Sequence, residues 1–420
     1  MENQNGVSKY AKGYEGKMVV ILFCVFGFVM LDRQALNFLS VFVLDDLGIN
    51  TAQFGFILSG FAFTWAISGY LGGWLSDKFY NKKRLFLGVM ILLFSVFSFS
   101  TGLAKGYVSL FAIRLIMGIF EGPTLPLAQS ILIAQSSPKR RGMNMGLIQG
   151  TAPSLFAVVF GPIVLVALAQ AFNWRMTFFL TIIPGLILVL FIFKTLKEPY
   201  PDKKKPEVEA AERVSPLVVF KNRNALISFI MSPFYIGWYM LLVCFAPLFL
   251  VTVKGLTPTT MSLVIAAMGA GGVVWGVVVP ALSDKFGRKP IFLIFSIFSV
   301  VTPIGLLYVP GSSVWLIAIL VFVGFSGVGC HPMYMSTIPS ESVGLKAAGT
   351  AIGTIMAFGE LGGGVVGTAI AGILGQTYGL QSILVLDLGM AIVCFVLGIF
   401  YYETAPAILA KRAGNQEAVA

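Results

Sequence analysis

The chain has 420 residues, of which 57% are hydrophobic and only 11% are charged, and its mean hydropathy is +0.89. An ordinary soluble domain carries about 25% charged residues, so this composition excludes a soluble globular protein and predicts a polytopic membrane protein. The formal net charge of +11 could indicate a nucleic-acid partner. Because the basic residues alternate with long apolar runs, we attribute the charge to membrane topology and expect no nucleic acid.

Twelve apolar runs predict an all-α membrane protein with twelve transmembrane helices, because a bilayer-spanning helix needs about 20 apolar residues. From Pro290 to Ser340 there is no Asp, Glu, Lys or Arg, and the turn Pro310-Gly311-Ser312-Ser313 divides this stretch into two helices. The expected spans are 18–44, 52–75, 85–103, 107–133, 143–168, 174–193, 224–251, 258–282, 290–309, 313–338, 346–374 and 380–402.

Ionisable residues inside these spans are the strongest indication of function. A charged side chain at the centre of a bilayer costs roughly 2.5 to 3.5 kcal/mol even on lenient scales, so such groups usually face a wet cavity and partner one another. A carrier is therefore the first hypothesis. The six residues are Asp32, Arg33, Arg114, Glu121, Glu360 and Asp387.

Basic residues outside the membrane lie mainly on one side. With loops alternating between sides, 24 of the 29 Lys and Arg residues fall on the N-terminal side and three on the other. The positive-inside rule then predicts that both termini are cytoplasmic and that the protein lies in the cell inner membrane. The first 17 residues are polar, and no small-residue cleavage site follows the first apolar run, so we expect no cleaved signal peptide.

The longest connection, 195–223, contains several prolines and a lysine run, and it predicts a cytoplasmic linker between helix bundles 1–194 and 224–420. The halves share a pentapeptide: Leu-Ser-Asp-Lys-Phe occurs at 75–79 and again at 282–286, each time followed by basic residues. Such an internal repeat is typical of two-lobed transporters, in which substrate binds near the midplane where the lobes meet.

This repeated segment resembles the loop that joins helices two and three, and helices eight and nine, in the major facilitator superfamily. Tyr80 replaces the family's second glycine and Pro280 its first, while both aspartates and the basic residues match. The resemblance covers nearly the whole chain and implies two pseudo-symmetric six-helix bundles. We expect Asp77, Asp284 and Arg288 to act as gates that lock helix ends in the outward-open state.

A narrower resemblance lies in helices one and four. Leu31-Asp32-Arg33 and the segment from Arg114 through Glu121 to Pro126 look like the anion:cation symporter branch, which includes sugar-acid and organic-anion carriers. This resemblance implies that Asp32 and Glu121 exchange protons while Arg33 and Arg114 hold the substrate anion. It does not indicate which anion is carried.

Helix geometry agrees with such a site. Arg114 and Glu121 are seven residues apart, so they differ by only about 20° around the helix and share one face. Asp32 and Arg33 point about 100° apart, so helix one can offer Arg33 to the cavity while Asp32 faces a neighbouring helix or the cavity edge. Two carboxylates and two guanidinium groups sum to zero charge. Protonation of the carboxylates would free the guanidinium groups to bind a substrate carboxylate.

Other residues are candidates of lower rank. Helices two, five and seven line the cavity in the family, which implies substrate contacts for Trp65, Gln149, Tyr235 and Tyr239. Glu360 is a candidate for the substrate site or for a buried pair. The remaining features indicate packing or structure: Asp387, His331, the pair Gly146 and Gly150, and the four cysteines.

We therefore expect a monomeric carrier in the lipid bilayer that imports a small organic carboxylate, such as a sugar acid or an aromatic or short-chain acid, with protons. No nucleophile motif, phosphate loop or metal-ligand spacing is present in the sequence, so we expect no enzyme activity, no metal and no cofactor. Three alternatives stay open: a proton-driven exporter of drugs or metabolites with the same fold, a non-transporting membrane sensor, and sodium in place of protons.

Overall fold

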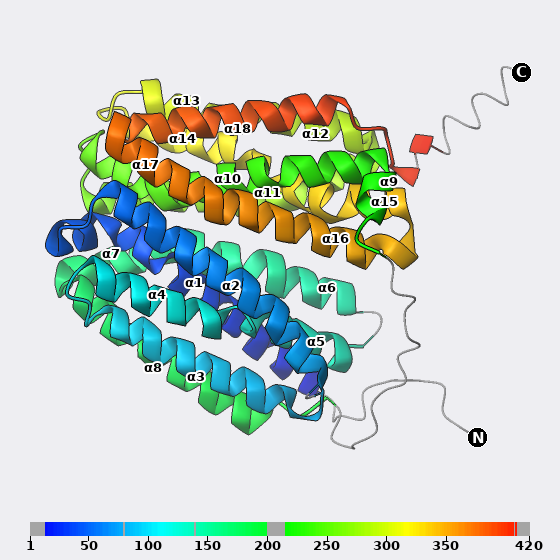
Figure 1. Ribbon diagram of the computed structural model, residues 1–420, viewed down its shortest axis with the longest axis horizontal. Coiled ribbons are helices and arrows are strands. Elements are labelled where there is room, and N and C mark those ends of the chain that lie inside the picture. The colour runs from blue at the N-terminus through cyan, green and yellow to red at the C-terminus, as the bar shows by residue number, and fades with distance from the viewer. Residues whose placement is uncertain (1–12, 79, 138–139, 200–214, 407, 410–420) are drawn as a thin grey trace, which may run out of the picture. The chain divides into compact units, whose positions relative to one another are not determined.

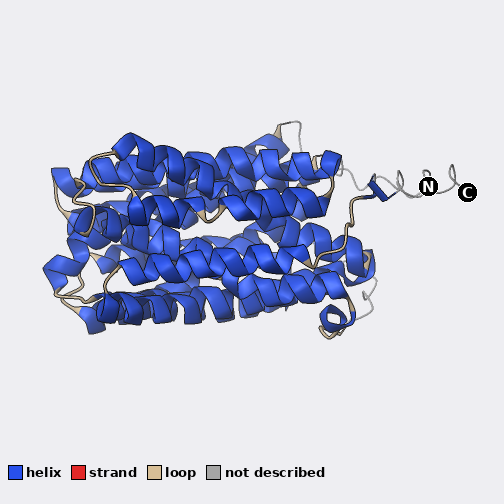
Figure 2. Cartoon of the chain, turned by 90° about the horizontal axis from the view of Figure 1, so that it is seen from above, coloured by secondary structure: helices blue, strands red, loops and turns tan. Residues whose placement is uncertain are grey.

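In the computed structural model of the protein, residues 13–78, 80–137, 140–199, 215–406 and 408–409 are described. These residues form helices and loops, and no strand occurs among them (Figure 2). Twelve helical segments are long and apolar enough to cross a membrane, the first being Tyr14–Leu47 and the last Gln381–Ile399. The predicted all-α fold and its twelve spans are confirmed.

The chain divides into two compact units (Figure 1). Unit 1 contains residues 1–49 and 60–206, and unit 2 contains residues 50–59 and 207–420. The first turns of α2 thus pack with unit 2. Residues 200–214 of the predicted linker lie outside the described residues.

The helices that begin before residue 200 are α1 (Tyr14–Leu47), α2 (Thr51–Lys78), η1 (Tyr80–Lys82), α3 (Lys83–Thr101), α4 (Tyr107–Glu121), α5 (Thr124–Gln135), α6 (Arg141–Gly146), η2 (Leu147–Thr151), η3 (Ser154–Phe160), α7 (Gly161–Ala171) and α8 (Trp174–Thr195).

The remaining helices all belong to unit 2. They begin with a short helix after the undescribed segment and end with the last span. They are α9 (Val218–Lys221), α10 (Arg223–Thr252), α11 (Pro258–Phe286), α12 (Arg288–Phe298), α13 (Val301–Tyr308), α14 (Val314–Gly324), η4 (Phe325–Cys330), η5 (Met333–Thr337), α15 (Ile338–Val343), α16 (Leu345–Gly359), η6 (Glu360–Gly367), α17 (Thr368–Tyr378) and α18 (Gln381–Ile399).

Local sequence explains several helix ends. Gly48 takes a left-handed conformation, with φ 61°, and its N–H bonds back to the last turn of α1. The side chain of Asn173 accepts a hydrogen bond of 2.7 Å from the N–H of Met176 and so caps α8. Thr257 caps α11 in the same way, with a proline following at the first helical position. The short connections between spans are therefore set by capping residues.

Several spans are not continuous α-helices. The fourth span breaks at Gly122 and Pro123, between α4 and α5. π-helical turns interrupt the fifth span (η2 and η3), the tenth (η5) and the eleventh (η6). Such π turns are rare and frequently occur at functional sites. Two of the predicted substrate residues lie in them: Gln149 in η2 and Glu360 at the start of η6.

The contact between α4 and α2 depends on two glycines one turn apart. A Cβ atom at Gly118 would lie 2.8 Å from the carbonyl oxygen of Phe61, and one at Gly122 would lie 2.8 Å from the amide nitrogen of Gly69. The hydroxyl of Ser68 donates a 2.9 Å hydrogen bond to the carbonyl oxygen of Gly118. Small residues let membrane helices approach this closely, and here they hold α4, which carries Arg114 and Glu121, against α2.

The predicted packing role of Gly146 and Gly150 is wrong. Both glycines are exposed, and a Cβ atom at either position would meet nothing within 4 Å. The G-x-x-x-G spacing alone does not tell which helix face meets a neighbour.

Alanine substitutions should separate these two glycine pairs. Each of Gly118→Ala and Gly122→Ala forces a Cβ atom into the backbone of α2, and overpacking of this kind typically costs about 1 to 3 kcal/mol. We therefore expect a lower melting temperature for both variants in detergent. Gly146→Ala and Gly150→Ala are the matched controls, and we expect them to melt at or slightly above the wild-type temperature, since alanine favours the helix. Equal melting temperatures for all four variants would contradict the close contact.

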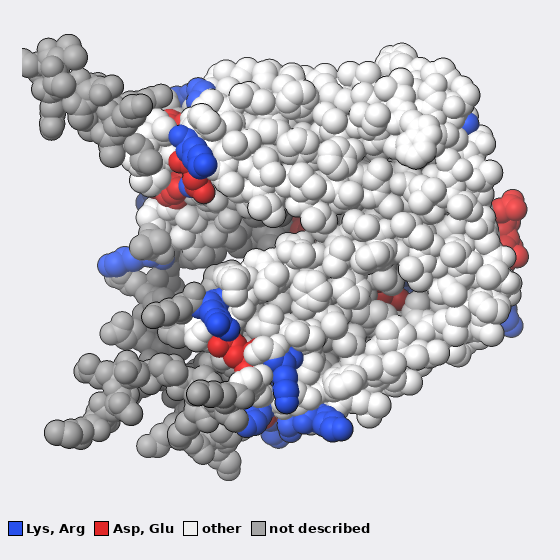
Figure 3. All heavy atoms as spheres, turned by 180° about the vertical axis from the view of Figure 1, so that it is seen from behind, with Lys and Arg blue, Asp and Glu red and all other residues white. Residues whose placement is uncertain are grey.

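The surface agrees with a membrane environment. On the face shown in Figure 3, the charged side chains gather at the helix ends and the middle is almost entirely uncharged. Large apolar side chains are widely exposed, for example Trp315 at 84%, Val108 at 76% and Leu190 at 70%. A soluble protein does not tolerate exposed apolar area on this scale, whereas lipid tails cover it without cost.

Candidate functional site

Asp32 lies in α1 and is fully buried among the helices of unit 1. The hydroxyl of Ser98 in α3 donates a 2.6 Å hydrogen bond to its Oδ1 atom, and Ser98 is itself 2.9 Å from the hydroxyl of Thr181 in α8. Its Oδ2 atom has no hydrogen-bond partner. As the helix geometry allowed, Asp32 faces neighbouring helices, and three helices meet at this carboxylate.

Arg114 lies in α4 and is 2% exposed. Its Nη1 atom is 3.7 Å from the sulfur of Met117, and its guanidinium carbon is 5.3 Å from the ring centre of Phe178. Its Nε and Nη2 atoms have no hydrogen-bond partner. Asp32 and Glu121 are its electrostatic neighbours. A buried guanidinium with two unused N–H donors is costly and is prepared to bind an anion in a bidentate manner.

Arg33 points away from Asp32 and toward α2. Its guanidinium carbon lies 4.2 Å from the ring centre of Trp65 and 5.6 Å from that of Phe61. A cation over an aromatic face at this distance is stabilised by about 0.5 to 2 kcal/mol. Trp65 is only 9% exposed and its ring faces Arg33, while its predicted contact with substrate stays a prediction.

Glu121 is fully buried at the end of α4, and neither carboxylate oxygen has a hydrogen-bond partner. Arg33, Asp32 and Arg114 all interact with it electrostatically, and Trp65 lies beside it. Unit 1 therefore brings together the four charged residues predicted for the site, within reach of one another's charge. Their formal charges cancel, which is the least costly arrangement in a medium of low dielectric constant.

Gln149 is exposed and lies in the π turn η2 of the fifth span. No hydrogen bond between described residues joins it to the four charged residues. Its assignment as a substrate residue stays a prediction that depends on the family resemblance.

The predicted substrate residues of unit 2 form a separate aromatic cluster. The hydroxyl of Tyr235 donates to the carbonyl oxygen of Gly327, and the ring of Tyr235 lies 4.4 Å from that of Tyr334 and 5.9 Å from that of His331. Tyr239 stacks on Phe325 at 5.9 Å. These contacts come from α10, η4 and η5, and the cluster contains the only histidine of the sequence.

Glu360 is 9% exposed and begins the π turn η6. The glycines that follow pack on α10: a Cβ atom at Gly362 would collide with Pro233, and one at Gly363 would lie 2.5 Å from the carbonyl oxygen of Pro233. The small residues of the segment 359–367 thus let η6 approach α10 closely. Tyr334 is an electrostatic neighbour of Glu360.

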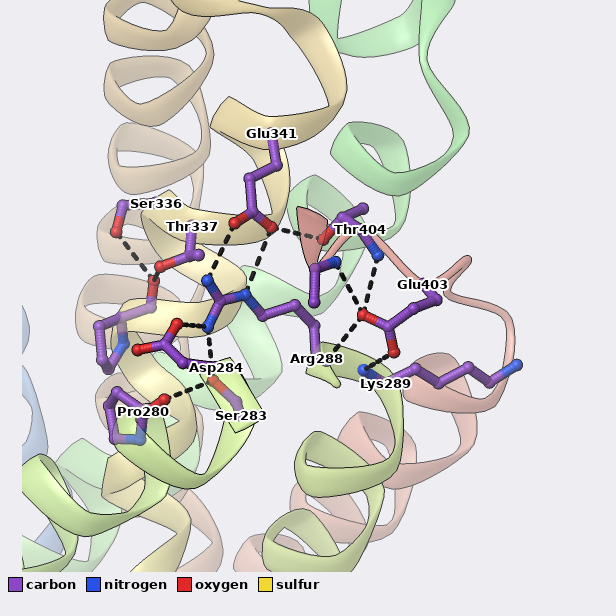
Figure 4. A network of polar contacts seen from close by, with 12 residues as sticks. Pro280, Ser283, Asp284, Arg288, Lys289, Ser336, Thr337, Glu341, Glu403 and Thr404 are labelled. Carbon is purple, nitrogen blue, oxygen red and sulfur yellow. Dashed lines mark hydrogen bonds and ion pairs between the residues drawn. The ribbon is translucent and has the colours of Figure 1, made fainter. Parts of the chain in front are cut away.

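The second copy of the repeated loop builds a polar network (Figure 4). Nη1 of Arg288 is 2.5 Å from Asp284 and 2.7 Å from the hydroxyl of Ser283, and its Nη2 is 2.9 Å from Glu341. Glu341 also accepts a 2.6 Å hydrogen bond from Thr404. Asp284 lies at the end of α11 and Arg288 at the start of α12, and their role as gates stays a prediction. The side chain of Asp77, from the first copy, lies outside the described part of the structure.

Sequence reasoning missed the residues that support the charged groups, above all Ser98, Thr181 and Phe178. One indication was available for Ser98. Ser95, Ser98 and Thr101 recur on one face of an apolar span and are all fully buried, a pattern that marks a polar face inside a bundle. Nothing in the spacing predicts that this face would meet Asp32.

Comparison with known proteins identifies the family and the fold of the chain. Residues 22–366 match the Major Facilitator Superfamily. The chain is 29% identical to the hexuronate transporter of Bacillus subtilis (strain 168), over 95% of this chain and 97% of the relative. It is 25% identical to a probable galactarate/D-glucarate transporter of Escherichia coli (strain K12), over 86% of this chain and 87% of the relative. The crystal structure of the nucleoside transporter NupG superimposes with a TM-score of 0.75 at 15% identity, covering 93% of this chain and 100% of that one, which is a similarity of fold alone.

Proposed function

Because the chain belongs to the major facilitator superfamily and is a multi-pass membrane transporter rather than an enzyme, we propose that it imports a small organic carboxylate together with protons. The proposal goes beyond the family in three respects: the chemical class of the cargo, the coupling ion and the residues that bind each.

The unused donors of Arg114 are the observation that carries the proposal. Its Nε and Nη2 atoms are buried without a partner, although a carboxylate on Asp32 and another on Glu121 lie within electrostatic reach. A site with a permanent structural ion pair would use these donors internally. Two N–H groups left on one edge of a guanidinium match the two oxygens of a carboxylate.

The names of the relatives support the same class of cargo. Hexuronates, galactarate and glucarate, which name these relatives, are sugar acids, and each carries at least one carboxylate. We therefore propose a sugar acid as the first substrate to test, held by Arg114 and Arg33 in unit 1. Gln149, Tyr235, Tyr239 and Glu360 are proposed to contact the hydroxyl-bearing part of the cargo.

Protons couple to this site through Asp32 and Glu121 in the proposed cycle. When both carboxylates accept a proton, the two guanidinium groups lose their internal counter-charges and the cargo carboxylate replaces them. At about 4 Å and an effective dielectric constant of about 20, one such interaction is worth roughly 4 kcal/mol before desolvation. Import of a monoanion with two protons would carry one net positive charge inward.

Movement of two lobes completes the proposed cycle. Bundles 1–194 and 224–420, joined by the linker 195–223, would open the site alternately to either side of the inner membrane, in a monomer with both termini in the cytoplasm. Asp77, Asp284 and Arg288 would then act as gates. The Arg288 network in Figure 4 supports this role, because it ties the ends of three spans and the segment after α18 together through one guanidinium group.

A ligand screen with the purified protein tests the proposal. Sugar acids, aromatic acids and short-chain carboxylates are added at acidic and neutral pH, and the melting temperature is measured, followed by radiolabelled uptake into proteoliposomes. We expect a sugar acid to raise the melting temperature more at acidic pH and to accumulate under an inward proton gradient. Stabilisation only by cationic or neutral compounds, or movement only outward, would contradict the proposal and favour an exporter.

A further inference from the structure

Asp387 takes no part in the proposed cycle, although it is fully buried in the last span, α18. Neither of its carboxylate oxygens has a hydrogen-bond partner, and no described residue forms an ion pair with it. An ionised carboxylate in such surroundings would cost several kcal/mol. The neutral, protonated acid is the less costly form of Asp387 in these surroundings.

The burial pattern shows which residue of unit 1 corresponds to Asp387. Six buried positions of α8 recur in α18 at a constant offset of 206 residues, so that Thr181 corresponds to Asp387. The six positions in α8 are Thr177, Phe178, Thr181, Gly185, Leu188 and Ile192, and those in α18 are Ile383, Leu384, Asp387, Ala391, Cys394 and Gly398.

Asp32, Ser98 and Thr181 together are called the Asp32 cluster. The two other helices that carry it, α1 and α3, have counterparts in unit 2 as well. In α3 and the span α12–α13, the buried residues Leu87, Gly88, Ile91, Ser95 and Ser98 recur at an offset of 204 as Ile291, Phe292, Phe295, Ser299 and Thr302. In α1 and α10, Met18, Leu22, Val25, Val29 and Asp32 recur at an offset of 206 as Asn224, Ser228, Met231, Tyr235 and Trp238.

Hydrogen bonds at the helix ends support these offsets independently. In unit 1 the carboxylate of Glu198 accepts from the backbone N–H groups of Arg84 and Leu85, at 3.0 and 3.3 Å. In unit 2 the carboxylate of Glu403 accepts from the N–H groups of Arg288 and Lys289, at 2.8 and 3.2 Å. The same cap is thus built at positions 204 to 205 residues apart.

The three residues of the Asp32 cluster therefore have counterparts by position in unit 2, and these counterparts do not bond to one another. Asp32, Ser98 and Thr181 correspond to Trp238, Thr302 and Asp387. In unit 1 the two hydroxyl groups and the carboxylate bond to one another. In unit 2 the indole Nε1, the threonine Oγ1 and both carboxyl oxygens are buried without any hydrogen-bond partner.

Packing contacts are consistent with this correspondence. Met390 lies one turn from Asp387 in α18, and its sulfur would be 2.6 Å from a Cβ atom at Gly237, the residue next to Trp238. Both α10 and α13, which carry Trp238 and Thr302, pack directly on α18. The two donors and the acid thus lie on helices that touch.

We propose that Asp387, Trp238 and Thr302 form a second proton-binding site of the carrier, the counterpart in unit 2 of the Asp32 cluster. The O–H bond of the neutral acid breaks when α10, α13 and α18 shift enough for Trp238 and Thr302 to donate to the carboxylate, and the proton passes to water. The reverse movement withdraws the donors and returns the proton to Asp387. The inference rests on proton coupling as proposed above, but it does not require that Asp32 or Glu121 carry the proton.

Few charged groups lie where they could change the binding of a proton to Asp387. The cations on the helices packed against α18 lie at helix ends, where Arg223 bonds to Tyr402 and Arg288 bonds to Glu341. The titratable residues on these helices and on α18 itself are Arg223, Tyr235, Tyr239 and Cys244 of α10, Arg288 and Lys289 of α12, Tyr308 of α13, Tyr378 of α17 and Cys394 of α18.

Infrared difference spectroscopy and electrical recording test the site with full-length protein. Asp387→Asn fixes the neutral form with almost no change in shape, and Asp45→Asn, an exposed carboxylate on α1, is the control. In the wild type and in Asp45→Asn, we expect carbonyl bands of buried protonated acids that disappear as pH rises, and we expect Asp387→Asn to lack one of these bands. Thr302→Val and Trp238→Phe should keep the band and lose it only at higher pH, because each removes a donor to the ionised form.

In proteoliposomes, the ratio of charge moved to substrate moved should fall by one in Asp387→Asn and stay at the wild-type value in Asp45→Asn. A band that does not respond to pH, together with an unchanged charge ratio, would overturn the second site and leave Asp387 as a purely structural acid. If Asp32→Asn and Glu121→Gln leave the charge ratio unchanged while Asp387→Asn lowers it, the proposed coupling in unit 1 fails and this site stands.

Discussion

Replacing Arg114 with alanine is expected to weaken substrate binding by roughly 30-fold to several thousand-fold, the largest effect of any single change in the protein. Loss of one partner from a buried, hydrogen-bonded charge pair costs about 2 to 5 kcal/mol, and each 1.4 kcal/mol is a factor of about ten in the dissociation constant. Arg114 is nearly fully buried and its Nε and Nη2 donors are unused in the absence of cargo, so no other group of the protein replaces them.

Arg114→Lys tests the geometry of the contact rather than its charge. Lysine keeps the positive charge but offers a point charge in place of a planar fork of donors. We expect this variant to recover part of the lost affinity and to remain clearly weaker than the wild type. Binding is measured by isothermal titration calorimetry with the sugar acid that the screen identifies.

Arg141→Ala is the matched control for both variants, because Arg141 is an exposed arginine of the same unit. It should bind substrate with the wild-type constant. Size-exclusion profiles and melting temperatures show whether the Arg114 variants remain folded. If folded Arg114→Ala binds the sugar acid as tightly as the Arg141→Ala control, the guanidinium group of Arg114 does not hold the cargo.

The sequence predicted the spans well, because length and hydropathy alone define them. The first span was predicted at 18–44 and extends over Tyr14–Leu47, where Gly48 ends it in a left-handed conformation. The π turns and the break at Gly122 and Pro123 were not predicted, since they arise from how neighbouring helices replace backbone hydrogen bonds. These are local departures within correctly placed spans.

The sequence predicts which site residues share a helix face, but it does not predict the contacts between helices. Arg114 and Glu121 lie on one face because of the helical period alone, and both are buried in unit 1. The bond from Ser98 to Asp32 and the ring of Phe178 near Arg114 depend on how α3 and α8 pack. That packing is a tertiary property, which hydropathy does not encode.

The two glycine pairs also show that spacing along the sequence does not predict contacts between helices. Gly118 and Gly122 have the same spacing as Gly146 and Gly150, yet only the first pair touches a neighbouring helix. Spacing defines a face of the helix, and the neighbours of that helix decide whether the face is used.

Glu121→Gln is expected to lower uphill accumulation of substrate while substrate still exchanges across the membrane. Glutamine keeps the shape of the side chain but holds it in the neutral state, which in the proposed cycle is the state that binds the anion. The empty carrier then returns without releasing that proton, so each cycle moves one proton fewer and the gradient drives less net import. Counterflow and gradient-driven uptake in proteoliposomes measure the two activities separately.

The change of substrate affinity with pH shows whether protons favour or oppose substrate binding. If two protons bind with one anion, the affinity of the wild type should fall about 100-fold for each pH unit once both carboxylates are ionised in the empty carrier, because each coupled proton contributes about tenfold. Glu121→Gln and Asp32→Asn should each reduce this dependence to about tenfold. Asp45→Asn, an exposed carboxylate on α1, should leave it unchanged.

The Asp32→Asn variant shows whether weaker uphill transport reflects lost proton coupling or a misfolded protein. Oδ1 of an asparagine can still accept the hydrogen bond from Ser98 that Asp32 accepts at 2.6 Å, so the contact between α1, α3 and α8 persists without a titratable group. Ser98→Ala does the opposite, since it leaves the carboxylate but removes a donor that favours its ionised form. We therefore expect Asp32→Asn to accumulate less substrate at every pH and Ser98→Ala to keep uphill transport with a shifted pH optimum. Uphill transport by the Asp32→Asn, Glu121→Gln double variant would show that the driving proton binds elsewhere.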